Sequence, residues 1–154
     1  MGYHVYGWIE SNWETPQERD GTISMWEPLL SLIPFGLIGD AISNYLFGLA
    51  RSPDAGAVFS GRGVPPDCSD LVRSEVERNE RFIATYGEGY FGHTYATWGE
   101  VLQALAAPRA PKPDDDELPG GWKAVIESVG FLSSRVDAMR QPYDQLRLIV
   151  WATW

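Results

Sequence analysis

The pattern of hydrophobic and polar positions predicts a strand near each end of the chain. Residues 3–10 are dense in β-branched and aromatic side chains, and a polar stretch with Pro16 and Gly21 follows them. This composition is typical of a strand and a loop, and residues 22–26 are the candidate hairpin partner. Residues 146–154 are apolar on both faces of a second strand. We expect this strand inside a sheet or against a partner chain, which makes a homodimer credible.

Between these strands, hydrophobic positions recur at three- and four-residue steps, which predicts four helices. The expected starts are the N-caps Asp40 and Ser69, the capping box of Thr97 and Glu100, and Trp122. The expected ends are Gly48, Gly87, Leu105 and Met139, with Pro142 terminating the last helix. Residues 57–59 are a candidate brief strand, and the two prolines in residues 60–67 predict a rigid, irregular loop.

Together these elements predict one α+β domain spanning residues 1–154. We expect a small, mainly antiparallel sheet, made of the N-terminal hairpin and the C-terminal strand and packed by about four helices. Residues 107–121 combine four prolines with an acidic run, which predicts an extended, solvated loop.

Charge and composition exclude several classes of function. A formal charge of −9 would repel a phosphate backbone, so we expect no general nucleic-acid binding. The apolar stretch 29–49 is interrupted by Pro34, Gly36 and Asp40, so it does not predict a membrane span. Cys68 is the single cysteine, and the first residues lack the basic and apolar regions of a secretion signal. These features favour a cytoplasmic protein.

Several motifs give only weak support for a phosphate loop, a zinc site or a catalytic dyad. Residues 87–92 match G-x-G-x-x-G, but they follow a predicted helix instead of joining a strand to a helix, so we interpret them as a helix-to-strand connection. The two histidines and Cys68 lack the paired spacing of a zinc site, and we expect no metal and no cofactor. A Cys68–His93 catalytic dyad is formally open because a thiol near a helix N-terminus ionises more easily.

Arg62 and His93 are the main candidate site residues. Arg62 stands between two glycines, where its guanidinium is suited to a carboxylate or phosphate; the alternative is a structural arginine bound to Asp67 or a helix end. His93 lies between a glycine-rich loop and a helix start, where it is either a site residue or a capping residue at the edge of the core.

Three aromatic residues are candidate stacking partners for a ring. Trp8, Tyr95 and Trp98 lie on the first strand and near the start of the third helix, although aromatic residues in such positions usually belong to the core.

The chain resembles a group of small uncharacterised bacterial and phage proteins. The similarity rests on Val-Tyr-Gly-Trp-Ile-Glu at residues 5–10, Gly-Arg-Gly-Val-Pro at 61–65 and His-Thr-Tyr-Ala-Thr at 93–97. It covers roughly residues 1–105 and implies an origin in a phage or mobile element, with no activity that can be carried over.

Three functional hypotheses follow. The leading one is a non-catalytic phage counter-defence protein that captures a small anionic ligand such as a nucleotide, with Arg62 pairing the anion, His93 in the site, and Trp8, Tyr95 or Trp98 on the ring. The second is a small hydrolase or phosphoesterase that uses His93, Arg62 and Asp67. The third is an inhibitor or immunity protein that meets a basic partner through its acidic surface, Trp151 and Trp154.

Overall fold

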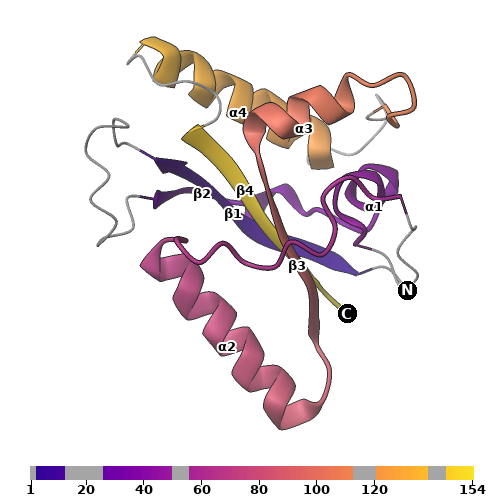
Figure 1. Cartoon of the computed structure of the whole chain (residues 1–154), viewed down its shortest axis with the longest axis vertical. Coiled ribbons are helices and arrows are strands. Elements are labelled where there is room, and N and C mark those ends of the chain that lie inside the picture. The colour runs from indigo at the N-terminus through magenta and orange to yellow at the C-terminus, as the bar shows by residue number, and fades with distance from the viewer. Residues whose placement is uncertain (1–2, 13–25, 50–55, 113–120, 139–144) are drawn as a thin grey trace.

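Four antiparallel strands form one sheet in the order β2-β1-β4-β3 (Figure 1). The computed structural model describes residues 3–12, 26–49, 56–112, 121–138 and 145–154. The strands are β1 (His4–Asn12), β2 (Trp26–Ser31), β3 (Tyr90–Thr97) and β4 (Leu146–Thr153). With helices on the sheet, this is the α+β fold that the sequence predicts.

β4 is a central strand, hydrogen-bonded to β1 on one side and β3 on the other. Every residue from Leu146 to Ala152 is buried. Leu148 and Val150 belong to the larger core, whereas Ile149 and Trp151 belong to a smaller cluster on the opposite face. The prediction of a strand inside the sheet is therefore confirmed, and β4 needs no partner chain to cover it.

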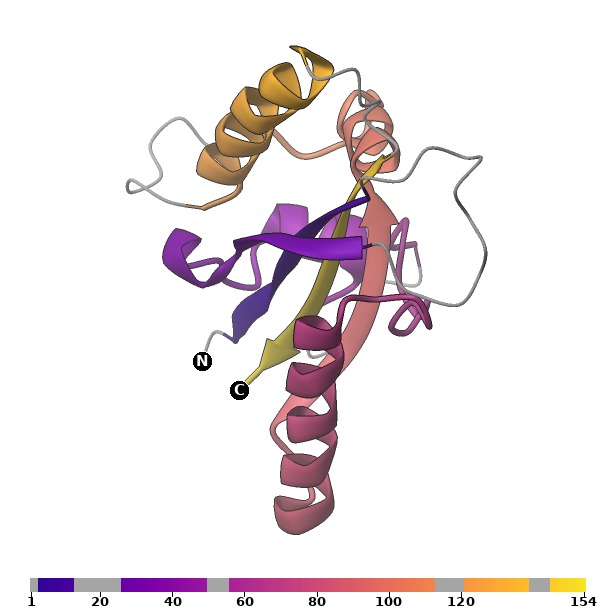
Figure 2. The same ribbon diagram turned by 90° about the vertical axis from the view of Figure 1, so that its left-hand side faces the viewer.

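The larger core lies between one face of the sheet and three helices, α1 (Ala41–Phe47), α3 (Trp98–Leu105) and α4 (Gly121–Ala138). Two of these helices begin with the predicted caps: Asp40 accepts a hydrogen bond from the Ser43 amide, and Thr97 and Glu100 form a capping box. α3 and α4 lie together above the sheet in Figures 1 and 2. This face carries most of the buried apolar surface.

The opposite face is covered by one long helix, α2 (Asp70–Tyr86), which lies below the sheet in both views. Ser69 caps its start and Gly87 ends it in the left-handed conformation, with φ of 78°. Val72, Val76 and Asn79 are buried, whereas Tyr86 is 66% exposed. Tyr86 is exposed because the last turns of α2 extend past the end of the sheet (Figure 2).

Two local predictions need correction. Among the described residues, the hairpin partner of β1 is β2, residues 26–31, which shares Trp26 with the predicted range 22–26; Pro28 is tolerated because β2 is an edge strand and pairs beside a register shift between Ile9 and Glu10. Residues 57–59 form a turn, since the amides of Val58 and Phe59 donate to the last carbonyls of α1. Residues 22–25, 113–120 and 142 lie outside the described residues. Within the described chain, no helix is long and apolar enough to cross a membrane.

Candidate functional site

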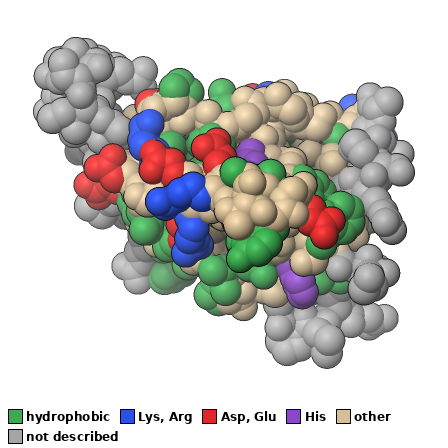
Figure 3. Space-filling view, turned by 90° about the horizontal axis from the view of Figure 1, so that it is seen from below, with side chains coloured by type: hydrophobic (Ala, Val, Ile, Leu, Met, Phe, Trp, Pro, Cys, Tyr) green, Lys and Arg blue, Asp and Glu red, His purple; other side chains and the backbone are tan. Residues whose placement is uncertain are grey.

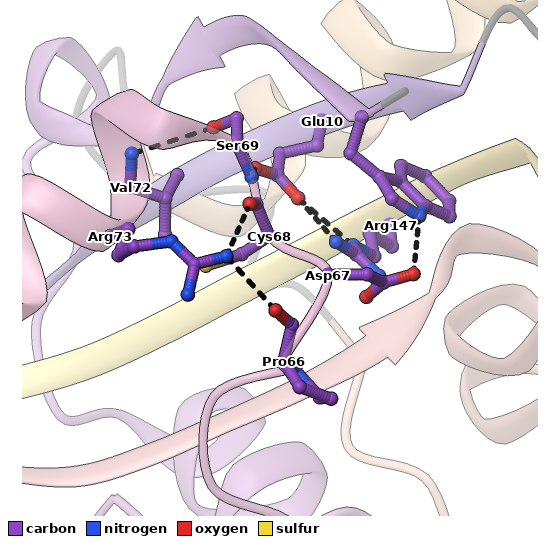
Figure 4. A network of polar contacts seen from close by, with 9 residues as sticks. Glu10, Pro66, Asp67, Cys68, Ser69, Val72, Arg73 and Arg147 are labelled. Atoms are coloured by element: carbon purple, nitrogen blue, oxygen red, sulfur yellow. Dashed lines mark hydrogen bonds and ion pairs between the residues drawn. The ribbon is translucent and has the colours of Figure 1, made fainter. Parts of the chain in front are cut away.

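A buried ion pair on the α2 side of the sheet joins the two central strands. Glu10 of β1 is fully buried and Arg147 of β4 is 4% exposed. The Arg147 Nε donates to Glu10 Oε2 at 2.9 Å, and Nη2 lies 2.9 Å from the same oxygen without hydrogen-bonding geometry. Arg147 Nη1 reaches out to Asp67 Oδ1 at 2.8 Å (Figure 4). One arginine therefore connects the sheet to the loop before α2.

The same carboxylate positions the start of α2. Glu10 Oε1 accepts a hydrogen bond of 2.7 Å from the amide of Ser69, the N-cap residue. Arg73, one turn into the helix, donates to the carbonyls of Pro66 and Cys68. These contacts, drawn in Figure 4, hold the loop and the helix start against the sheet. This network has a structural role, because its polar groups form hydrogen bonds and ion pairs with one another.

Asp67, a candidate catalytic residue, is part of this network. Burial by itself would raise the pKa of its carboxyl, but the hydrogen bond and charge of Arg147, with a hydrogen bond from the Trp26 indole, lower it below 3.8. The Arg147 guanidinium also lies 3.8 Å from the centre of the Trp26 ring, in cation–π contact. Asp67 therefore serves as an anchor for Arg147 in this structure.

Arg62 also has protein partners. Its guanidinium makes two hydrogen bonds of 3.0 and 3.1 Å to the carboxylate of Glu100 and lies over the rings of Phe59 and Tyr95. Its hydrogen bonds lower the pKa of Glu100 despite the opposing effect of burial. Two hydrogen bonds join the loop that carries Arg62 to β3. Arg62 donates to the carbonyl of Tyr95, and Thr94 Oγ1 donates to the carbonyl of Phe59. Arg62 thus acts as a structural residue that ties the loop to the start of α3.

His93 lies within an irregularity in the β3–β4 register, between Phe91 and Thr94, and stacks on Trp151, with ring centroids 5.7 Å apart. Its Nε2 is buried without a hydrogen-bond partner. Burial lowers the pKa of the imidazole below 6.5, and the charge of Glu80 on α2 opposes this only in part. The neutral form is therefore favoured, and the ring serves as a packing surface for Trp151.

The remaining candidates separate into two groups. Trp8 and Tyr95 pack on the α2 side of the sheet, where the Trp8 indole donates to Glu75 Oε2 at 2.9 Å. Trp98 lies in the larger core with 1% of its surface exposed, so in this structure its ring packs against the core and is not open to a ligand. Cys68 is buried, and burial raises the pKa of its thiol, which is unfavourable for a nucleophile.

The structure does not bring the predicted site residues together around one space. Arg62, Asp67 and His93, the set of the enzyme hypothesis, each contact different partners: Glu100, Arg147 and Trp151. Of the two tryptophans of the inhibitor hypothesis, Trp151 is 3% exposed and Trp154 is 55% exposed. The glycine motif at 87–92 is a helix-to-strand connection, as expected, because Gly87 ends α2 and Tyr90 begins β3.

A pocket of about 310 Å³ lies between α2 and the sheet; Trp151 and Trp154 line it, whereas Arg62, Asp67 and His93 do not. Its lining includes Tyr6, Glu75, Arg78, Asn79, Tyr90 and Trp151. The Trp151 indole donates to the side-chain oxygen of Asn79 at 3.2 Å once the amide is oriented to satisfy both groups. Figure 3 views the molecule from the α2 end and shows acidic and basic side chains beside hydrophobic ones. This pocket is the best candidate site among the described residues.

Gly7 allows β1 to approach β4 closely beside this pocket. It has φ of 149°, and a Cβ at this position would lie 2.0 Å from the carbonyl oxygen of Ile149. The lack of space for a side chain therefore explains why the Tyr-Gly-Trp motif has a glycine at this position. Gly7 lines the pocket together with Tyr6. Sequence reasoning placed the motif on the first strand and singled out Trp8 there, but not Tyr6 or Gly7.

Arg78 was missed by sequence reasoning because it lies on the exposed side of a predicted amphipathic helix. The signal was its spacing: Glu75, Arg78 and Asn79 lie three and four residues apart, on one side of α2. Within the described chain, no group of three histidine, cysteine or acidic side chains could hold a metal ion. The chain matches no protein-family model, no curated protein and no solved structure.

Proposed function

We propose that this protein is a non-catalytic binding protein that captures a small anionic ligand with a planar ring in the pocket between α2 and the sheet. Arg78 would pair with the anion, and the aromatic lining would contact the ring. The observation that carries this proposal is the combination, in one pocket of about 310 Å³, of aromatic walls and an arginine that has no partner among the described residues. This volume falls at the lower end of the range for small-molecule sites.

Arg78 differs from three other arginines of the described chain. Arg62, Arg73 and Arg147 all donate hydrogen bonds to protein groups. Arg78 makes no hydrogen bond, ion pair or cation–π contact with the described residues. Its planar guanidinium is therefore available for a carboxylate or phosphate.

The other groups in the pocket favour a ring that carries hydrogen-bond donors. Tyr6, Tyr90 and Trp151 provide aromatic surface, on which a base or similar ring can stack. Glu75 accepts one hydrogen bond, from Trp8, through Oε2, so Oε1 remains available to a donor on the ligand. A nucleotide combines the three required features: an anionic group, a planar ring and donors on the ring edge.

The resemblance to phage proteins supports a biological setting for this binding. We propose that the protein acts in the cytoplasm as a counter-defence protein that removes a nucleotide signal from solution. Tyr6 and Gly7, which belong to the first motif of the resemblance, line the pocket.

Isothermal titration calorimetry against a panel of nucleoside mono-, di- and triphosphates tests the proposal. We expect at least one nucleotide to bind at a 1:1 ratio, and Arg78→Ala to weaken that binding at least tenfold. Arg81→Ala is the matched control, because Arg81 is exposed on the same helix and is not among the residues that line the pocket. Absence of binding to the whole panel, or equal affinity of the Arg78 and Arg81 variants, would reject the proposal.

A further inference from the structure

The pocket adjoins a second aromatic recess at the C-terminal end of α2. This recess has a volume of about 350 Å³, and Phe82, Tyr86, Glu88 and Gly89 contribute to its lining. Thr153 and Trp154 line both the recess and the pocket. The two spaces are therefore neighbours that share one wall.

Both spaces follow a single stripe of α2. Glu75, Asn79, Phe82 and Tyr86 follow one another at steps of four, three and four residues, with Arg78 beside Asn79, so they lie along one side of the helix. From the first to the last of them the stripe covers roughly 16 Å, at a rise of about 1.5 Å per residue. The site is therefore elongated along the helix axis.

The second recess has large aromatic side chains that the described chain leaves partly uncovered. Phe82 is 42% exposed, Tyr86 66% and Trp154 55%. Phe82 contacts Tyr86 at 4.5 Å between ring centroids and Tyr90 at 5.6 Å, so the wall of the recess is held in place by ring contacts. Exposed aromatic surface that is fixed in this way is suited to stacking with a ring of a ligand.

Arg78 lines the pocket, and along α2 it lies between Glu75, which also lines the pocket, and Phe82, which lines the recess. It is three residues after Glu75 and four residues before Phe82. A phosphate paired with Arg78 would therefore have an aromatic-lined space on each side. Each space also contains one carboxylate, Glu75 in the pocket and Glu88 in the recess, which would repel additional phosphates and accept hydrogen bonds from donors on a base.

From this arrangement we infer that the ligand is a dinucleotide, with its linking phosphodiester at Arg78, one base in the pocket and the other in the second recess. The inference rests on the proposed function and names the ligand class for the same site. The pocket alone would hold a mononucleotide, whereas the shared wall and the central arginine match an order of ring, phosphate and ring.

Titration calorimetry with the dinucleoside monophosphates ApA and GpG, and with AMP and GMP, tests this inference. We expect one dinucleotide to bind at 1:1 and at least tenfold more tightly than its mononucleotide, because the second base adds stacking to a ligand that is already held. Tyr86→Ala should remove that gain and leave the mononucleotide affinity within twofold. Tyr86 is 66% exposed, so this variant is expected to keep its fold, which circular dichroism checks.

Leu71→Ala is the control, since Leu71 is a 43% exposed apolar residue on the same helix and lines neither space. It should leave both affinities unchanged. Equal affinity for dinucleotide and mononucleotide, or a dinucleotide affinity unaffected by Tyr86→Ala, would overturn the inference while leaving the proposed pocket intact. If no mononucleotide or dinucleotide binds, the proposed function and this inference both fail.

Discussion

The two faces of the sheet are built from the same strands but differ in chemistry. Toward α1, α3 and α4, the strands present residues such as Ile9, Leu148 and Val150, which are fully buried in one continuous core. Toward α2, they present Glu10, Arg147 and large aromatic residues, with a smaller buried cluster. Alternation along each strand places these two sets on opposite sides.

This difference separates stability from recognition. Apolar side chains of varied shape fill the larger core, and the Trp122 indole within it donates to Ser43 Oγ at 2.7 Å. On the α2 face, a single helix covers four strands, and the aromatic side chains there leave a pocket and a recess at the margin of the helix. We therefore expect substitutions on the first face to affect folding and those at the margin of the second to affect binding.

The largest effect on stability is expected at the buried ion pair of Glu10 and Arg147, which lies on the α2 face but holds the fold together. Arg147→Met leaves Glu10 buried without its cation, and such a loss typically costs about 3–5 kcal/mol. Chemical denaturation measures the free energy of unfolding. The double variant Glu10→Leu/Arg147→Met should recover much of the loss, because it removes the unpaired charge. A change below about 1 kcal/mol in the single variant would show that the pair is not buried as described.

The comparison of the two faces is tested most directly by a pair of truncations. Leu148→Ala in the larger core should cost about 2–5 kcal/mol through lost burial and a cavity. Tyr6→Ala, at the half-buried margin of the pocket, should cost about 1 kcal/mol but should weaken nucleotide binding. Thermal denaturation and calorimetry of both variants separate these outcomes. Equal destabilisation by the two substitutions would remove the distinction between the faces.

Local sequence signals predicted most of the fold. The caps Asp40, Ser69 and Thr97 act within three residues of their partners, so the sequence alone identifies them. Residues 146–154 are apolar on both faces of the predicted strand, and this pattern was sufficient to predict a strand buried on both sides. β2 was misplaced because its edge position, which permits Pro28, depends on the order of the strands, and that order is not a local property.

The site was far less predictable than the fold. The contact between Glu10 and Arg147 joins residues 137 positions apart, and no local pattern indicates it. Arg62 looked available between its two glycines, but the partner Glu100 is supplied by a helix start 38 residues away. The pocket arises where α2 packs on the sheet, so its lining residues come from separate segments of the chain, and only Tyr6 and Gly7 belong to a motif of the resemblance.

Arg62→Ala should have a small effect on stability and none on binding. Its pair with Glu100 is about one-third exposed on each side, and such pairs contribute roughly 0.2–1 kcal/mol. Because Arg62 lowers the pKa of Glu100, its contribution is present above pH 4.5 and is lost as the carboxylate is protonated at lower pH. Denaturation at neutral pH and below pH 4 measures the difference. A tenfold loss of nucleotide affinity in Arg62→Ala would show that Arg62 belongs to the binding site.

The smallest effect concerns the pH dependence set by His93. Its pKa is lowered by burial in the folded state, so the unfolded chain binds the proton more readily and stability falls as pH drops below about 6.5. His93→Gln should flatten the curve of unfolding free energy between pH 7 and the range where carboxylates titrate. His4→Gln, at an exposed position on β1, is the control and should leave the slope from His93 in place. Because His93 stacks on Trp151, the same titration should change the tryptophan fluorescence of the wild type, and a loss of that change in the His93 variant would assign it to this ring pair.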